Sequence, residues 1–359
     1  MIVGKTLAIV VGIALVALAL NDVFQSVIVP RAVGRRFRPS SYLSRFLWSI
    51  WPALAWRIHP RDTDKREDFL AVFAPFNLIM ILGLWSLLLL LGYAIMLYAL
   101  RDAVRPTLDS FYEALYFAGT SYFTIGFGDF VGRHGWTRLI SLAAGASGLA
   151  VVSTTTAYLF AIFGSFQARE AFVVNLGARA GTPPSGIGLL AISGYAGVME
   201  GFPQLMRDAQ HWCSVVMETH LAYPVLAYFR SSHDNQSWVG TLGTLLDAST
   251  LALTTVKCNA GEARIFHNLG RHAASDLARY FRVKVVLHDA GITRAEFDQA
   301  CERLTSAGFE LHDRERAWER FAALRAEYAG SLNAIAHFFS IPPLQWVGDR
   351  STIEAKPPH

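Results

Sequence analysis

The stretch Thr124-Ile125-Gly126-Phe127-Gly128-Asp129, TIGFGD in one-letter code, decides how the rest of this chain is interpreted. Gly126 and Gly128 have no Cβ, so they can adopt backbone angles that other residues avoid. Two such residues, one position apart, allow successive backbone carbonyls to point toward one axis instead of alternating away from it. Thr124 adds a hydroxyl group at one end, and Asp129 adds a carboxylate at the other.

A short helix is predicted directly before this stretch. Ser110 and Glu113 have the S-x-x-E spacing of a capping box, and residues 114–122 continue with apolar and aromatic side chains. The C-terminal end of such a helix carries roughly half a negative charge, which favours a nearby cation. An ordinary buried helix followed by a glycine turn is the alternative.

The composition indicates a membrane protein. Of the 359 residues, 53% are hydrophobic, and the mean hydropathy is +0.32. Residues 6–29, 69–100 and 136–166 form three apolar runs, each longer than the roughly 20 residues that a bilayer core requires. We therefore predict three transmembrane helices and a multi-pass protein of the cell (inner) membrane. A cleaved signal peptide is the alternative for the first run.

Basic residues set the predicted orientation. The loop between the first and second runs contains more Arg and Lys than Asp and Glu, so it is predicted to be cytoplasmic. The N-terminus and residues 101–135 would then lie outside, and everything after residue 166 would be cytoplasmic. Residues 34–68 mix aromatic side chains with arginines, which favours an amphipathic segment at the inner interface. A soluble helix is the alternative there.

With these flanks, TIGFGD resembles the TVGYG type of selectivity filter. The chain resembles a bacterial potassium channel family with a two-helix, one-filter ion channel module, here residues 69–166, to which an N-terminal helix (1–33) and a C-terminal cytoplasmic domain (167–359) are added. The resemblance implies an all-α homotetramer in a lipid bilayer, because each chain supplies one filter segment. It implies no enzymatic activity, no cofactor and no nucleic-acid partner. The implied filter residues are Thr124, Ile125, Gly126, Phe127 and Gly128, with K+ held at the first four and Asp129 at the outer mouth.

Two residues depart from the family pattern. Phe127 stands where tyrosine is commoner, and it lacks the hydroxyl group that can tether the filter. Thr120 stands where some bacterial channels have a glutamate. The strictness of potassium selectivity therefore stays open, and a nonselective cation channel is one alternative. A membrane sensor or interaction protein with a non-conducting, pore-like module is another.

Three polar or small residues in the apolar runs are further candidates. Gly145 and Gly148 form a candidate gating hinge, with simple packing as the alternative. Asp22 is a candidate intramembrane polar site, because a carboxylate there is costly unless it is paired or hydrated. Arg31 or Arg35 would be natural partners. If the helix ends early, Asp22 would instead lie among lipid headgroups.

The C-terminal domain is predicted to be mainly helical. Thr293 and Glu296 have capping-box spacing, and apolar residues recur at helical spacing from Trp318 to Phe339. Residues 177–188, with two prolines, are predicted to form a linker. Residues 238–256 could be buried core or a further span. We expect this domain to gate or assemble the tetramer, with an unknown cytoplasmic ligand or protein as a possible partner.

Overall fold

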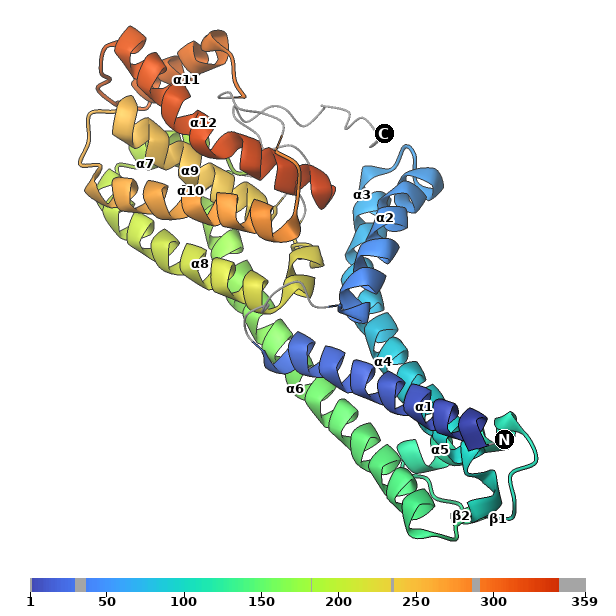
Figure 1. Ribbon diagram of the computed structural model, residues 1–359. Coiled ribbons are helices and arrows are strands. Elements are labelled where there is room, and N and C mark those ends of the chain that lie inside the picture. Colours follow the sequence, from blue (N-terminus) through green and yellow to red (C-terminus); the bar gives the residue numbers. More distant parts are fainter. Residues whose placement is uncertain (1, 30–36, 182, 234–235, 286–290, 342–359) are drawn as a thin grey trace. The chain divides into compact units, whose positions relative to one another are not determined.

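The computed structural model describes residues 2–29, 37–181, 183–233, 236–285 and 291–341 (Figure 1). This part of the chain is almost entirely helical. Its one sheet has two short antiparallel strands, β1 (Val104–Arg105) and β2 (Val131–Gly132). The chain divides into two compact units. The first unit contains Met1–Leu54 and Val72–Phe163, and the second contains Ala55–Ala71 and Gly164–His359.

Three helices are long and apolar enough to cross a membrane, which agrees with the three predicted runs. The first is α1 (Ile2–Val23), which continues as the π-helical turn η1 (Phe24–Ile28). The second candidate span, Thr63–Ala99, joins α3 (Thr63–Ala71) to α4 (Phe73–Ala99). The third is α6 (Gly135–Ala180). Helix α6 therefore extends well beyond the predicted end of the third run at residue 166.

Helices α1 and α4 pack side by side through two glycines (Figure 1). A Cβ atom on Gly12 would lie 2.6 Å from the Gly92 carbonyl oxygen, and one on Gly92 would lie 2.9 Å from the Gly12 oxygen. Small residues allow this close approach of two backbones, which is typical of helix pairs in membranes. Lys5 forms an ion pair of 2.8 Å with Asp102, just beyond the C-terminal end of α4. The two helices therefore run in opposite directions.

The predicted segment 34–68 is divided between the two units where the structure describes it. Helix α2 (Pro39–Ile58) belongs to the first unit as far as Leu54, and its remainder belongs, with α3, to the second unit. The reason is packing between aromatic rings. Trp48 lies 4.7 Å from Phe73, and Trp51 stacks on Phe76 at 5.0 Å, both between ring centroids. Helix α2 thus contacts the start of α4.

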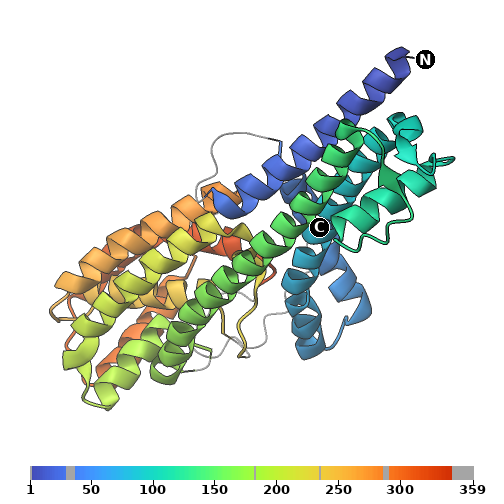
Figure 2. The same ribbon diagram turned by 90° about the horizontal axis from the view of Figure 1, so that it is seen from below.

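The second unit is a helical domain built around α9 (Trp238–Thr254). Every residue of α9 except Gly240 is buried, so residues 238–254 form the core of this unit. Asp247 is accommodated there because Arg325 and Tyr328 donate hydrogen bonds to it at 2.9 and 2.6 Å. Helices α7 (Gly186–Tyr195), α8 (Phe202–Ala222), α10 (Gly261–Phe281) and α12 (Arg314–Phe338) pack against α9 (Figure 2).

Shorter elements complete the two units. Helix α11 (Arg294–Ser306) begins with the predicted capping box of Thr293 and Glu296. Two 3-10 turns, η3 (Met199–Gly201) and η4 (Pro224–Tyr228), flank α8. In the first unit, η2 (Arg101–Ala103) precedes β1, and α5 (Phe111–Tyr122) lies between the two strands.

The predicted linker is shorter than expected. Helix α6 passes without a break through the predicted domain boundary at 166/167 and ends at Ala180, while the division between units falls at Phe163. Ser185 then caps α7 by accepting a hydrogen bond of 3.0 Å from the Gly188 amide. A Cβ on Gly186 would lie 2.6 Å from the Ala248 nitrogen. Gly186 therefore allows close packing of α7 against α9. From sequence alone, a glycine needed for close packing cannot be told from a glycine in a flexible linker.

Candidate functional site

Helix α5 leads directly into the TIGFGD stretch (Figure 1). The Ser110 hydroxyl oxygen accepts a hydrogen bond of 3.3 Å from the Glu113 amide, so Ser110 is the N-cap. The Glu113 carboxylate reaches one residue further back than in a regular capping box and accepts a bond of 2.6 Å from the Asp109 amide. Both side chains therefore act at the start of this helix, where a negative charge also suits the helix dipole.

Polar contacts inside the first unit hold α5 between α4 and α6. The Tyr122 hydroxyl, in the last turn of α5, lies 3.1 Å from the Ser86 hydroxyl of α4. Tyr93 of α4 lies 2.7 Å from the Ser147 hydroxyl of α6 and donates a hydrogen bond of 3.1 Å to the Ala143 carbonyl. These tyrosines fix the position of the helix end from which the TIGFGD stretch begins.

Left-handed backbone angles alternate along the stretch. The φ angle is +56° at Thr124, +60° at Gly126 and +83° at Gly128. In an extended strand, successive carbonyls point in opposite directions. Left-handed angles at every second residue reverse every second peptide, so that successive carbonyls can face one axis. The two glycines were predicted to supply these angles, but Thr124 was not. A β-branched residue with positive φ is uncommon and strained, and strain of this kind clusters at functional sites.

The start of the stretch is hydrogen-bonded to the end of α5. The Thr120 carbonyl oxygen accepts from the Ile125 amide at 2.8 Å and from the Gly126 amide at 3.1 Å. The Thr120 hydroxyl is buried and donates to the Phe117 carbonyl at 3.0 Å. Its side chain therefore bonds within its own helix, whereas its backbone carbonyl supports the stretch.

Tyr116 is a supporting residue that sequence reasoning missed. Its ring is parallel to that of Phe127, with 6.5 Å between the centroids, and the nearby Asp129 carboxylate raises the pKa of its hydroxyl group. It therefore links α5 to the far end of the stretch, although Phe127 itself has no hydroxyl group. The sequence did contain a clue to this role. Tyr116 lies four residues before Thr120, so the two residues were expected on the same face of α5.

The apolar side chains of the stretch are exposed in the single chain. Phe123, Ile125 and Phe127 have exposed fractions of 58%, 53% and 68%. The chain's own side chains therefore bury neither Ile125 nor Phe127. Large apolar surfaces of this kind usually mark a contact with another molecule.

Gly145 and Gly148 both face the end of α5. A Cβ on Gly148 would overlap the Tyr122 carbonyl oxygen, and one on Gly145 would lie 3.2 Å from the Ser121 carbonyl oxygen. The structure thus gives both glycines a packing reason, while α6 continues through them as one helix. Their role as a gating hinge stays a prediction.

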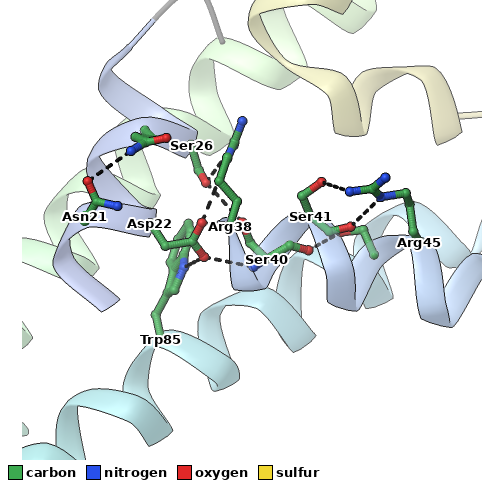
Figure 3. Close-up of polar contacts among 10 residues, drawn as sticks. Asn21, Asp22, Ser26, Arg38, Ser40, Ser41, Arg45 and Trp85 are labelled. Carbon is green, nitrogen blue, oxygen red and sulfur yellow. Dashed lines mark hydrogen bonds and ion pairs between the residues drawn. The ribbon is translucent and has the colours of Figure 1, made fainter. Parts of the chain in front are cut away.

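Asp22 lies at the end of α1 and is completely buried. It is hydrogen-bonded to Ser40 and Trp85, and Arg38 is near it (Figure 3). The partners expected from sequence, Arg31 and Arg35, lie outside the described residues. The α-helical part of α1 does end early, at Val23, but the carboxylate has protein partners in place of headgroups.

The far part of α6 carries a buried charge cluster in the second unit. Arg169 donates hydrogen bonds to the carbonyls of Leu226 and Phe229 at 3.1 and 2.9 Å, and it pairs with Glu170 at 2.8 Å. Burial, together with the Arg169 charge, lowers the pKa of His220 beside it to about 3. This cluster fastens the end of α6 to the second unit. The sequence showed only two adjacent charges after an apolar run.

Comparison with known proteins agrees with this geometry. Residues 81–165 match a family described as ion channel, and the match includes most of α4, α5, the TIGFGD stretch and the first part of α6. Over 206 residues, the chain is 21% identical to a protein of Bacillus subtilis (strain 168) described as an uncharacterized membrane protein, YdjJ. That alignment covers 55% of this chain and 59% of the relative, which is less than two thirds of the relative's length. No solved structure matches the chain. The apolar helices and these matches support a membrane protein with an ion channel domain.

Proposed function

We propose that this ion channel protein is a potassium-selective channel that conducts K+ passively through a pore formed by four copies of the chain. One observation carries the proposal. Left-handed backbone angles at Thr124, Gly126 and Gly128 alternate with the intervening residues, and this favours a column of carbonyls that can replace the water around a potassium ion. In this proposal the carbonyls of Thr124, Ile125, Gly126 and Phe127 hold K+.

A homotetramer follows from the geometry of such a site. One chain has a single TIGFGD stretch, and one column of carbonyls cannot surround an ion. The exposed side chains of Ile125 and Phe127 would be covered by neighbouring subunits. Asp129 would lie at the outer mouth and attract cations, an effect that salt screens over roughly 10 Å at 0.1 M.

The proposed orientation puts the N-terminus outside and the second unit in the cytoplasm of the cell (inner) membrane. It rests on the basic loop that contains α2 and α3. The second unit would gate or assemble the channel, because the Arg169 cluster joins it to the same helix that carries Gly145 and Gly148. A cytoplasmic ligand would act only by binding the open and closed arrangements unequally.

The test is ion flux from purified protein in liposomes, with barium as blocker and with reversal potentials in potassium against sodium. Gly126→Ala is the decisive variant, because alanine at φ +60° is strained by roughly 1–2 kcal/mol. We expect it to lower the ratio of intact to distorted filter about tenfold, since 1.4 kcal/mol is a factor of ten, and thereby to reduce the preference for potassium. Gly164→Ala is the matched control, since this glycine is helical and nothing lies within 4 Å of an added Cβ.

Three results would each exclude part of the proposal. Equal permeability to potassium and sodium in the wild type would indicate a nonselective cation channel. An unchanged ion preference in Gly126→Ala would mean that TIGFGD is not the filter. No flux from intact tetramers would favour a membrane sensor or interaction protein with a non-conducting, pore-like module.

A further inference from the structure

Among the described residues of the first unit, Asp22 is the most deeply buried charged residue. Its side chain has an exposed fraction of 0%, although it ends an apolar helix that is a candidate membrane span. A buried carboxylate is strongly unfavourable unless hydrogen bonds and a counter-charge compensate for its lost water. Its partners therefore explain why this position can hold an aspartate.

Three donors converge on this carboxylate (Figure 3). The Ser40 amide and the Trp85 indole N–H donate to Oδ2, and the Ser40 hydroxyl donates to Oδ1, each at 2.9 Å. Arg38 adds a positive charge, with its Nε 3.9 Å from Oδ1. Its Nη2 also donates to the Ser26 hydroxyl at 2.9 Å. Both oxygens of the carboxylate thus accept hydrogen bonds from the protein itself.

These donors come from different helices. Asp22 ends α1, Trp85 belongs to α4, and Ser40 is the second residue of α2, directly after Pro39. The first amides of a helix have no partner within it, so a carboxylate there both satisfies an amide and suits the helix dipole. Asp22 therefore caps α2 from another helix, and it joins α1, α2 and α4 at one point.

The same point lies beside the support of the proposed filter. Ser86, the residue after Trp85, is in contact with the Tyr122 hydroxyl at 3.1 Å. Tyr122 ends α5, whose Thr120 carbonyl accepts hydrogen bonds from the Ile125 and Gly126 amides of the TIGFGD stretch. A displacement of α4 at Trp85 would therefore reach the end of α5 through the adjacent residue.

From this geometry we propose that Asp22 is a positioning residue that clamps α2 to α1 and α4, and that release of this clamp changes the open probability of the pore. The statement that Asp22 clamps the three helices rests on the hydrogen bonds alone. The statement that its release changes the open probability rests on the proposed channel function. Ion selectivity does not depend on the clamp, because it is set in the TIGFGD stretch.

Hydrogen exchange of the full-length protein in lipid nanodiscs tests the clamp without any flux measurement. Asp22→Asn removes the charge and places an amide N–H₂ group among donors. We expect amide exchange over residues 40–43 to rise roughly tenfold or more, because a hydrogen bond to a charged group is lost. Asp102→Asn is the matched control, since Asp102 is an exposed carboxylate paired with Lys5. It should leave exchange in α2 unchanged.

Two milder variants cover the case in which Asp22→Asn fails to fold. Trp85→Phe and Ser40→Ala each remove one donor and keep the carboxylate. Each should raise exchange at the start of α2 by a smaller factor than Asp22→Asn. If all three variants exchange like the wild type, the clamp does not exist and the proposal is overturned.

Single-channel recording of the same variants tests the effect on open probability. A change in open probability with an unchanged reversal potential supports the coupling. Faster exchange in α2 with unchanged open probability overturns it and leaves Asp22 a purely structural cap. Should the wild type carry no current at all, the channel function fails, while the exchange data still decide whether the clamp exists.

Discussion

Gly148 allows two helices to approach closely, because it has no side chain. Its Cα faces the Tyr122 carbonyl so closely that a Cβ atom would overlap the oxygen. Helices α5 and α6 can therefore touch at the point where the TIGFGD stretch begins. The requirement concerns space rather than backbone angles, which separates Gly148 from Gly126 and Gly128 with their positive φ.

Gly148→Ala should destabilise the protein by about 1–3 kcal/mol, because the added methyl group must displace α5. Gly164→Ala, in the same helix but in open space, should be neutral or slightly stabilising, since alanine favours helix over glycine by up to about 1 kcal/mol. Thermal unfolding in detergent compares the two. Equal melting temperatures for both variants would show that α5 does not pack against Gly148.

His220 makes the stability of the second unit depend on pH. Burial and the Arg169 charge lower its pKa to about 3, so it stays neutral in the folded protein at pH values where the unfolded chain binds a proton. Above about pH 6.5 this histidine does not reduce the free energy of unfolding, because it is neutral in both states. As the pH decreases from 6.5 toward 3, the free energy of unfolding falls by up to about 1.4 kcal/mol per pH unit.

The matched variants are His220→Gln and His211→Gln, which lie in the same helix, the second at an exposed position. Between pH 7 and 5.5, the melting temperature of the wild type and of His211→Gln should fall more than that of His220→Gln. The same decrease in all three proteins would mean that His220 is not the titrating group.

Helix α6, like α2, contains residues of both units. Its part in the first unit contains Gly148, and its part in the second unit contains Arg169, whose guanidinium donates to the carbonyls of Leu226 and Phe229. Sequence predicted the apolar part of this helix, because a long apolar run is a local signal. The extension to Ala180 was missed because its buried face is completed by η4 and α8, which are distant in sequence.

Arg169→Met should destabilise the second unit by about 3–5 kcal/mol, because Glu170 is left as a buried charge without its arginine. The double variant Arg169→Met, Glu170→Met should recover part of the loss, since apolar residues can replace a buried ion pair. Arg179→Met, at an exposed position of the same helix, is the control. Thermal unfolding measures all three, and equal stability of the single and double variants would contradict a buried pair.

Across the whole molecule, local signals were readable from sequence and tertiary partners were not. The glycines of TIGFGD, the caps at Ser110 and Thr293 and the three apolar runs all depend on neighbours in the chain. By contrast, other interactions form only after the helices have packed. These are the interactions of Asp22 with Trp85, of Tyr116 with Asp129 and of Arg169 with Leu226. The expected partners of Asp22 were the nearby arginines for the same reason, since proximity along the chain was the available guide.

The bond between Asp22 and Trp85 also has a consequence for biosynthesis. The two residues are 63 positions apart, so a ribosome that adds roughly 5–20 residues per second makes Asp22 several seconds before its indole partner. During that interval α1 has a carboxylate and no α4. We therefore expect α1 to keep Asp22 hydrated at the membrane surface until α4 is synthesised, and the two helices to reach their final depth together.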